Sequence, residues 1–156
     1  AISVVYGKNL MPQKESPMLK STRAAAVYNR IAPPKANVTV ESLQLKSAGA
    51  DAAGRFQKNK PITVTCDIKN TGNTKINDLD AVIRVPDKNL ISKTLTMEEN
   101  GSVKITATYT PQQIGVVYLA CRADLSDAIS ESNEEDNKQI AALYILEYSS
   151  GSLLLF

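Results

Sequence analysis

The sequence predicts an all-β fold, an immunoglobulin-like seven-stranded β-sandwich with an N-terminal arm and a C-terminal extension. From residue 36 onward, apolar and polar residues alternate with a period of two in short runs. Turn residues separate these runs, and no helical period lies between them. This pattern favours two packed antiparallel sheets over a sheet with crossover helices. We expect an arm over residues 1–35, a sandwich over 36–148 and an apolar tail over 149–156.

The N-terminal arm is partly helical in this prediction and lacks the apolar residues for a core of its own. Ser16 and Pro17 suit the N-cap and first turn of a helix. Pro33 and Pro34 would end any regular element that precedes them. Residues 1–37 carry six basic side chains against one acidic side chain, a net charge of +5. Such an arm could be steered to an acidic surface or to nucleic acid, or could simply be solvated.

The alternating runs assign an inward face to six of the seven predicted strands. In order, the inward residues of these six strands are Val38, Val40, Leu43 and Leu45; Ile62, Val64, Cys66 and Ile68; Leu79, Ala81, Ile83 and Val85; Ile91, Leu95 and Met97; Val103, Ile105, Ala107 and Tyr109; and Val117, Leu119, Cys121, Ala123 and Leu125. The seventh strand is predicted over residues 140–148. The parity of the first strand shifts near Glu41 and Ser42, which predicts a β-bulge or a switch between sheets.

The two cysteines fall on inward positions of strands that face each other across a sandwich. Cys66 and Cys121 are 121 − 66 = 55 residues apart, a separation that suits a disulfide between the sheets. Two buried free thiols are the alternative, because unpaired cysteine packs as a small hydrophobe. A bridge would indicate an oxidising final location.

An acidic segment precedes the last strand. Residues 124–137 hold six acidic side chains and no basic one, a net charge of −6. Asp124, Asp127, Glu131, Glu134 and Asp136 could offer oxygen ligands to calcium, but they lack the ligand spacing and the glycine of a dedicated loop. Turns closed by side chains, together with solvated charge, account for them better, and we predict no metal and no cofactor.

The composition argues against an enzyme. The chain has no histidine, which excludes catalytic sites built on it. Phosphate-binding glycine loops and Cys-x-x-Cys pairs are also absent from the sequence. The longest apolar run, residues 141–146, is far shorter than the roughly 20 residues that span a bilayer, so we expect no membrane insertion. We therefore predict a non-enzymatic protein.

Three motifs resemble a known family, the cell-adhesion-related domain found in bacteria, or CARDB. They are Ile62-Thr-Val-Thr-x-x-Ile-Lys-Asn-Thr-Gly72, Thr108-Tyr-Thr-Pro-x-x-x-Gly115 and Asp127-Ala-Ile-Ser-Glu131-Ser-Asn133-Glu134-x-x-Asn137. The resemblance implies a seven-stranded sandwich of the kind found in surface and secreted proteins of bacteria and archaea. It also implies that a structural corner formed by Glu131, Asn133, Glu134 and Asn137 ties the loop between the last two strands. One extra residue before Asn137 departs from the family pattern and predicts a slightly looser corner. Members are mostly adhesive or spacer modules, so the resemblance indicates the fold far more than the ligand.

The tail ends in four large apolar residues after Ser149-Ser-Gly-Ser152, which reads as a tether. These residues could fold back onto their own sandwich or insert into a neighbour. We expect arm and tail to make the inter-subunit contacts through their apolar residues Ile2, Val4, Val5, Met18, Leu19, Leu153, Leu154, Leu155 and Phe156.

The predicted function is that of a structural subunit in a larger extracellular assembly, either a virion decoration or cement protein or a subunit of a surface fibre. The alternative is a cell-surface adhesion or carbohydrate-binding module, which exposed aromatic residues would favour. The expected partners are other copies of the chain, in a homo-oligomer, and other subunits of a capsid or fibre, whereas nucleic acid is not expected. The expected location is extracellular, on a virion or a cell surface.

Overall fold

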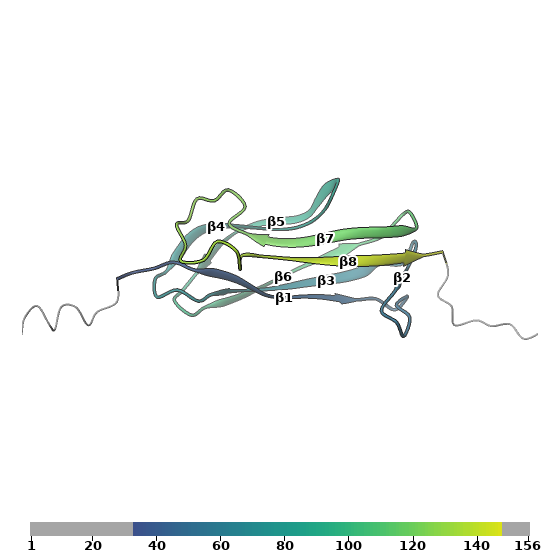
Figure 1. Cartoon of the computed structure of the whole chain (residues 1–156), viewed down its shortest axis with the longest axis horizontal. Helices are drawn as coiled ribbons and strands as arrows, with labels where there is room; N and C mark the ends of the chain where they lie inside the picture. The colour runs from purple at the N-terminus through teal and green to yellow at the C-terminus, as the bar shows by residue number, and fades with distance from the viewer. Residues whose placement is uncertain (1–32, 148–156) are drawn as a thin grey trace, which may run out of the picture. The chain divides into compact units, whose positions relative to one another are not determined.

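A computed structural model describes residues 33–147 (Figure 1). The compact unit that holds all the strands begins at Pro34. Its elements are β1 (Val38–Lys46), β2 (Phe56–Gln57), β3 (Ile62–Asn70), β4 (Ile76–Val85), β5 (Lys88–Met97), β6 (Ser102–Tyr109), β7 (Gly115–Ala123) and β8 (Lys138–Leu146). The predicted helix of the arm lies outside the described residues.

The strands form two layers, as Figure 1 shows. A three-stranded sheet has the order β1-β3-β6, and a five-stranded sheet has the order β2-β8-β7-β4-β5. All pairings are antiparallel except the short one between β2 and β8. The predicted all-β sandwich is therefore confirmed.

The core lies between the layers because alternate side chains of each strand point inward. In β3, for example, Ile62, Val64, Cys66 and Ile68 are all fully buried, while the residues between them are not. From the facing layer, Leu79, Ile83, Leu119 and Leu143 are also fully buried. Because each of the seven predicted strands supplies inward residues to this one core, the sandwich behaves as a single packed body.

Two details differ from the sequence prediction. The structure has a short additional strand, β2, which pairs in parallel with the end of β8 through Phe56 and Gln57. Two residues are too few to show a period, so no sequence pattern predicted this strand. Leu125, predicted to be an inward strand residue, instead follows the end of β7 at Ala123 and lies half-buried in a turn. The strand stops because Asp124 takes a positive φ of 50°.

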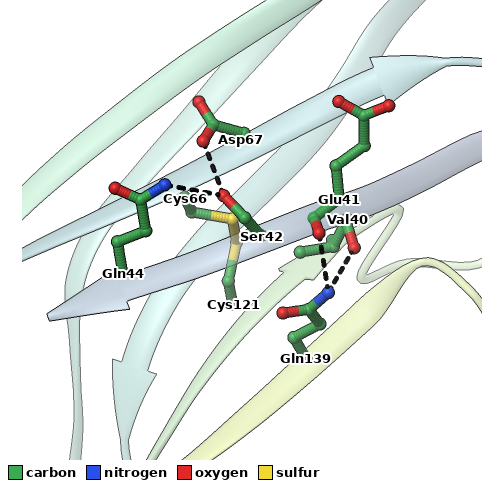
Figure 2. The surroundings of a disulfide bond; sticks show 8 residues. All are labelled: Val40, Glu41, Ser42, Gln44, Cys66, Asp67, Cys121 and Gln139. Carbon is green, nitrogen blue, oxygen red and sulfur yellow. Dashed lines mark hydrogen bonds between the residues drawn. A yellow bond between two sulfur atoms is a disulfide. The ribbon is translucent and has the colours of Figure 1, made fainter.

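The predicted irregularity in β1 is a β-bulge. The register with β3 shifts between Val40, opposite Ile68, and Ser42, opposite Asp67, so that Glu41 is the extra residue. The side-chain amide of Gln139 on β8 donates to the backbone carbonyls of Val40 at 2.8 Å and Glu41 at 3.1 Å. The backbone carbonyls at the bulge thus accept hydrogen bonds that connect β1, at the edge of the three-stranded sheet, to β8 in the five-stranded sheet (Figure 2).

The chain joins and leaves the sandwich at opposite ends. β1 begins at Val38, opposite the last residue of β3, Asn70. β8 ends at Leu146, whose carbonyl accepts a hydrogen bond from Lys58, close to the start of β3. The beginning of β1 and the end of β8 therefore lie at the two ends of the layered body, as Figure 1 shows.

Candidate functional site

The loop over residues 124–137, which we call the corner, starts from a buried carboxylate. Asp124 is 1% exposed. Its Oδ1 and Oδ2 accept hydrogen bonds from the backbone N–H groups of Ala128 and Ile129, each at 3.0 Å, and its own N–H donates to the carbonyl of Asp80. The carboxylate of Asp124 closes the turn after β7 because it accepts hydrogen bonds from backbone N–H groups that have left the strand pairing.

The four predicted corner residues all take part in this loop. Glu131 Oε2 accepts from Val38 N–H at 2.8 Å, which joins the corner to the start of β1. Glu134 Oε1 accepts from Glu131 N–H, and Asn133 Oδ1 accepts from Glu135 N–H. The carbonyl of Asn137, a buried residue, accepts from Ala123 N–H and brings the two ends of the loop together.

Sequence reasoning missed Asn37, the residue before β1, which contacts the corner through several hydrogen bonds. This buried side chain uses Oδ1 to accept from Ser132 Oγ and from Asn133 N–H, both at 2.9 Å. Its Nδ2 donates to Thr71 Oγ1 at 2.8 Å and to Asp136 Oδ2 at 3.2 Å. The sequence gives little indication of this role because the hydrogen-bond partners of Asn37 are up to 99 positions away along the chain. An asparagine directly before a strand is the one local hint.

Carboxylates crowd around Glu131 and change its acidity. The pKa of the Glu131 carboxyl is raised to about 7, first by burial and then by the negative charges of Glu134, Asp124 and Asp136. The hydrogen bond from the backbone N–H of Val38 opposes part of the rise. Glu131 Oε1 is buried and has no hydrogen-bond partner among the described residues. The protonated and charged forms of Glu131 are therefore both populated near neutral pH, where an ordinary glutamate is charged.

Three acidic residues of the corner are close enough to approach one cation. One oxygen from each of Asp124, Asp127 and Glu134 lies within 4.8 Å of the others. Both oxygens of Asp124 and Oε1 of Glu134 already accept backbone hydrogen bonds. These bonds are the turn-closing role expected from the sequence, and the absence of a metal stays a prediction.

The predicted disulfide is present between Cys66 on β3 and Cys121 on β7 (Figure 2). It joins the two sheets through the middle of the core, where both residues are fully buried. β3 is the direct partner of β1, and β7 is the direct partner of β8. The bridge thus connects the strand next to the beginning of the sandwich with the strand next to its end.

The outer face of β7 and β8 carries an apolar surface that we call the β7–β8 strip. Its members are large apolar residues between 50% and 64% exposed, namely Ile114, Val116, Tyr118, Ile140 and Tyr144. Sequence reasoning assigned an inward face to the strand that became β7 and only a residue range to the strand that became β8, and it described no outer face for either. The signal was available, because residues 116–121 and 140–146 are apolar at nearly every position, which indicates strands covered on both faces.

A hollow of about 390 Å³ opens beside one end of the strip. Asp87 and Lys88 line it from the β4–β5 hairpin, Tyr109 lines it from the end of β6, and Ile114 with Val116 belongs to both the hollow and the strip. The pKa of Tyr109 is raised by burial and by the nearby charge of Asp87. The hollow combines apolar walls with hydrogen-bonding side chains.

The residues predicted to contact other subunits lie outside the described residues, both in the arm and in the tail. No helix in residues 33–147 meets the length and apolarity needed to cross a membrane.

Comparisons with known proteins identify the family of this fold. The family model of CARDB matches residues 42–141, more than half of the chain. A solution structure of a CARDB domain from Pyrococcus furiosus has a TM-score of 0.62 at 16% identity, with 74% of this chain and 99% of that chain covered. A crystal structure of the same domain in complex with di-metal ions has a TM-score of 0.61 at 16% identity, covering 74% and 97%.

A third solved structure is a domain from Methanosarcina acetivorans that is assigned by its name to a cell surface protein. It has a TM-score of 0.52 at 20% identity, with 76% of this chain and 97% of that chain covered. Identities this low establish a shared fold. A comparison with curated proteins gives no match.

Proposed function

Since this chain belongs to the CARDB family, we propose that it is a non-enzymatic structural domain of an extracellular assembly, in which the sandwich transmits tension between the segments at its two ends. CARDB domains are non-catalytic. The absence of histidine from the whole sequence agrees with a role other than catalysis.

The observation that carries the proposal is the position of the disulfide relative to the two ends of the sandwich. Tension arriving through β1 and leaving through β8 must cross from one sheet to the other, because these strands belong to different sheets. The Cys66–Cys121 bridge makes this crossing covalent between their direct neighbours, β3 and β7. The bonds from Gln139 to Val40 and Glu41 add a direct connection between β8 and β1.

The direction of pulling relative to the strands determines how the hydrogen bonds between paired strands respond to such tension. Because the two ends of the sandwich are pulled apart along the strand direction, the hydrogen bonds between β1 and β3 are loaded together. Strands that are loaded together resist far better than strands that are peeled apart one bond at a time. The arrangement suits a spacer that keeps its length under force.

Of the assemblies considered from the sequence, a cell-surface structure is favoured over a virion coat. The similar domain from Methanosarcina acetivorans bears the name of a cell surface protein. The disulfide agrees with an oxidising location outside the cytosol. The arm over residues 1–35 and the tail over 149–156 are the proposed contacts with neighbouring subunits, including copies of the same chain.

Labelling of the native source material tests this role. Antibodies raised against residues 37–147 should decorate surface structures of intact cells in electron micrographs, at regular intervals where the subunit repeats. Labelling that is confined to the cytoplasm of permeabilised cells would contradict the proposal. The same samples, examined without reduction by mass spectrometry, should contain the Cys66–Cys121 bridge.

A second candidate function is adhesion to carbohydrate, and one observation favours it. Tyr118 and Tyr144 are 60% and 54% exposed on adjacent strands, which is how aromatic platforms stack on sugar rings. The hollow next to them offers amide and hydroxyl groups. Binding of the wild type to a member of a glycan panel, lost in both Tyr118→Ala and Tyr144→Ala, would support this function. If the wild type binds none of these glycans at millimolar concentration, adhesion to the glycans of that panel is excluded.

A further inference from the structure

The β7–β8 strip is a continuous apolar face across two adjacent strands. Val116 lies opposite Tyr144, Tyr118 opposite Ala142, and Ala120 opposite Ile140. These pairs form successive rows on the face that points away from the core, because the intervening residues Leu119 and Leu143 are fully buried. Exposed apolar patches of this kind mark surfaces that bind a protein segment, a membrane or a ligand.

Basic residues limit the kind of segment that can cover the strip. Arg122 and Lys138 lie opposite each other in the row beyond Ile140, and Arg84 lies beside Ala120 on β4. The N-terminal arm, with its net charge of +5, is repelled by these three cations. The C-terminal tail over residues 149–156 carries no charged side chain and holds Leu153, Leu154, Leu155 and Phe156.

The length of the tail matches the strip. β8 ends at Leu146, beside the row of Tyr144 and Val116. Residues 147–152 span at most about 20 Å, enough to reverse direction and rise by the roughly 10 Å that separates packed layers. Four extended residues then cover about 14 Å, the length of β8 from Tyr144 to Ile140.

We propose that residues 153–156 of this chain bind the β7–β8 strip. Within one copy the tether holds the segment at an effective concentration in the millimolar range, so even a weak contact is formed. Where copies are packed together, the same contact can be exchanged between neighbours and becomes a link in the assembly. The proposal does not depend on the disulfide or on tension, and it concerns a different face of the sandwich.

Nuclear magnetic resonance of the full chain tests the assignment. The variant Leu154→Ser/Leu155→Ser should shift the resonances of Val116, Tyr118, Ile140 and Tyr144 while leaving the core unchanged. A synthetic peptide of residues 149–156, added to this variant, should restore the original positions of these resonances with a Kd of about 0.1–1 mM.

Changes in the strip itself provide the matched comparison. Tyr118→Ser/Ile140→Ser in the variant background should weaken peptide binding at least about tenfold, since both side chains are exposed and supply the surface. Thr106→Ala, an exposed position on β6 in the other sheet, should leave binding unchanged. The proposal is overturned if the wild type and the tail variant have the same strip resonances, or if the strip is instead covered by a second copy in a dimer that forms without the tail.

Discussion

Removal of the disulfide by Cys66→Ala/Cys121→Ala should destabilise the sandwich by an amount that the structure allows us to estimate. The bridge closes a loop with a sequence separation of 55. By chain entropy, a loop of this length contributes about 4 kcal/mol to the free energy of unfolding, because the cross-link restricts the unfolded chain. Loss of two fully buried sulfur atoms adds about 1 kcal/mol each. The sum of about 6 kcal/mol is comparable to the whole stability of many domains.

Urea denaturation followed by circular dichroism measures this difference. The double variant should unfold at a far lower urea concentration than the oxidised protein, or be largely unfolded in water. The reduced wild type should fall between them, since it loses the cross-link but keeps both sulfur atoms in the core. The estimate is wrong if the oxidised protein and the double variant differ by less than about 1 kcal/mol, because the unfolded chain would then gain little from losing the cross-link.

Three further predictions concern the corner and the two segments beside it, the residues before β1 and the turn after β3. The pKa of the Glu131 carboxyl is raised from 4.5 to about 7 in the folded state. The stability that the protonated Glu131 side chain contributes is therefore fully present below pH 4.5, the pKa in the unfolded chain, and is lost as pH rises through about 7. Glu131→Gln should flatten this dependence, which is on the order of 1 kcal/mol for a partly exposed group and is measured by urea midpoints from pH 4 to 9. Asn37→Ala should cost about 2–3 kcal/mol because it removes the hydrogen bonds that this buried side chain makes with Thr71, Ser132 and Asn133, whereas the exposed Asn89→Ala should change the urea midpoint little. Gly72→Ala should lower the melting temperature markedly, because the added carbon would collide with the backbone of Lys35 and Asn37; an unchanged melting temperature would mean that this turn can move aside.

The strands and the disulfide could be predicted because they depend on the local alternation of apolar and polar residues along the chain. Alternation in residues 62–68 assigns an inward face to Cys66, and the same rule assigns one to Cys121. The bulge at Glu41 follows from the change of parity between Val40 and Leu43. In each case, the pleat of a strand converts a sequence period directly into a direction in space.

The rest depends on pairings that no local pattern contains. The partners of Asn37 come from the turn after β3 and from the corner before β8, so its role follows only from the assembled fold. β2 exists because Phe56 reaches the core beside Ile145, not because its two residues show a period. The β7–β8 strip was overlooked because alternation accounts for one face of a strand, whereas these strands are apolar on both.

Force spectroscopy on single molecules tests the central claim most directly. When the sandwich is pulled between residues 36 and 147, the oxidised protein should resist as one unit and then lengthen without releasing the bridged loop. At about 3.5 Å per residue, the 55-residue separation across the bridge corresponds to about 190 Å of hidden length. Cys66→Ala/Cys121→Ala should unfold at lower force and lengthen by about 190 Å more. If the oxidised sandwich yields gradually at low force, with β1 or β8 peeling away before the bridge is loaded, the proposed role in transmitting tension is contradicted.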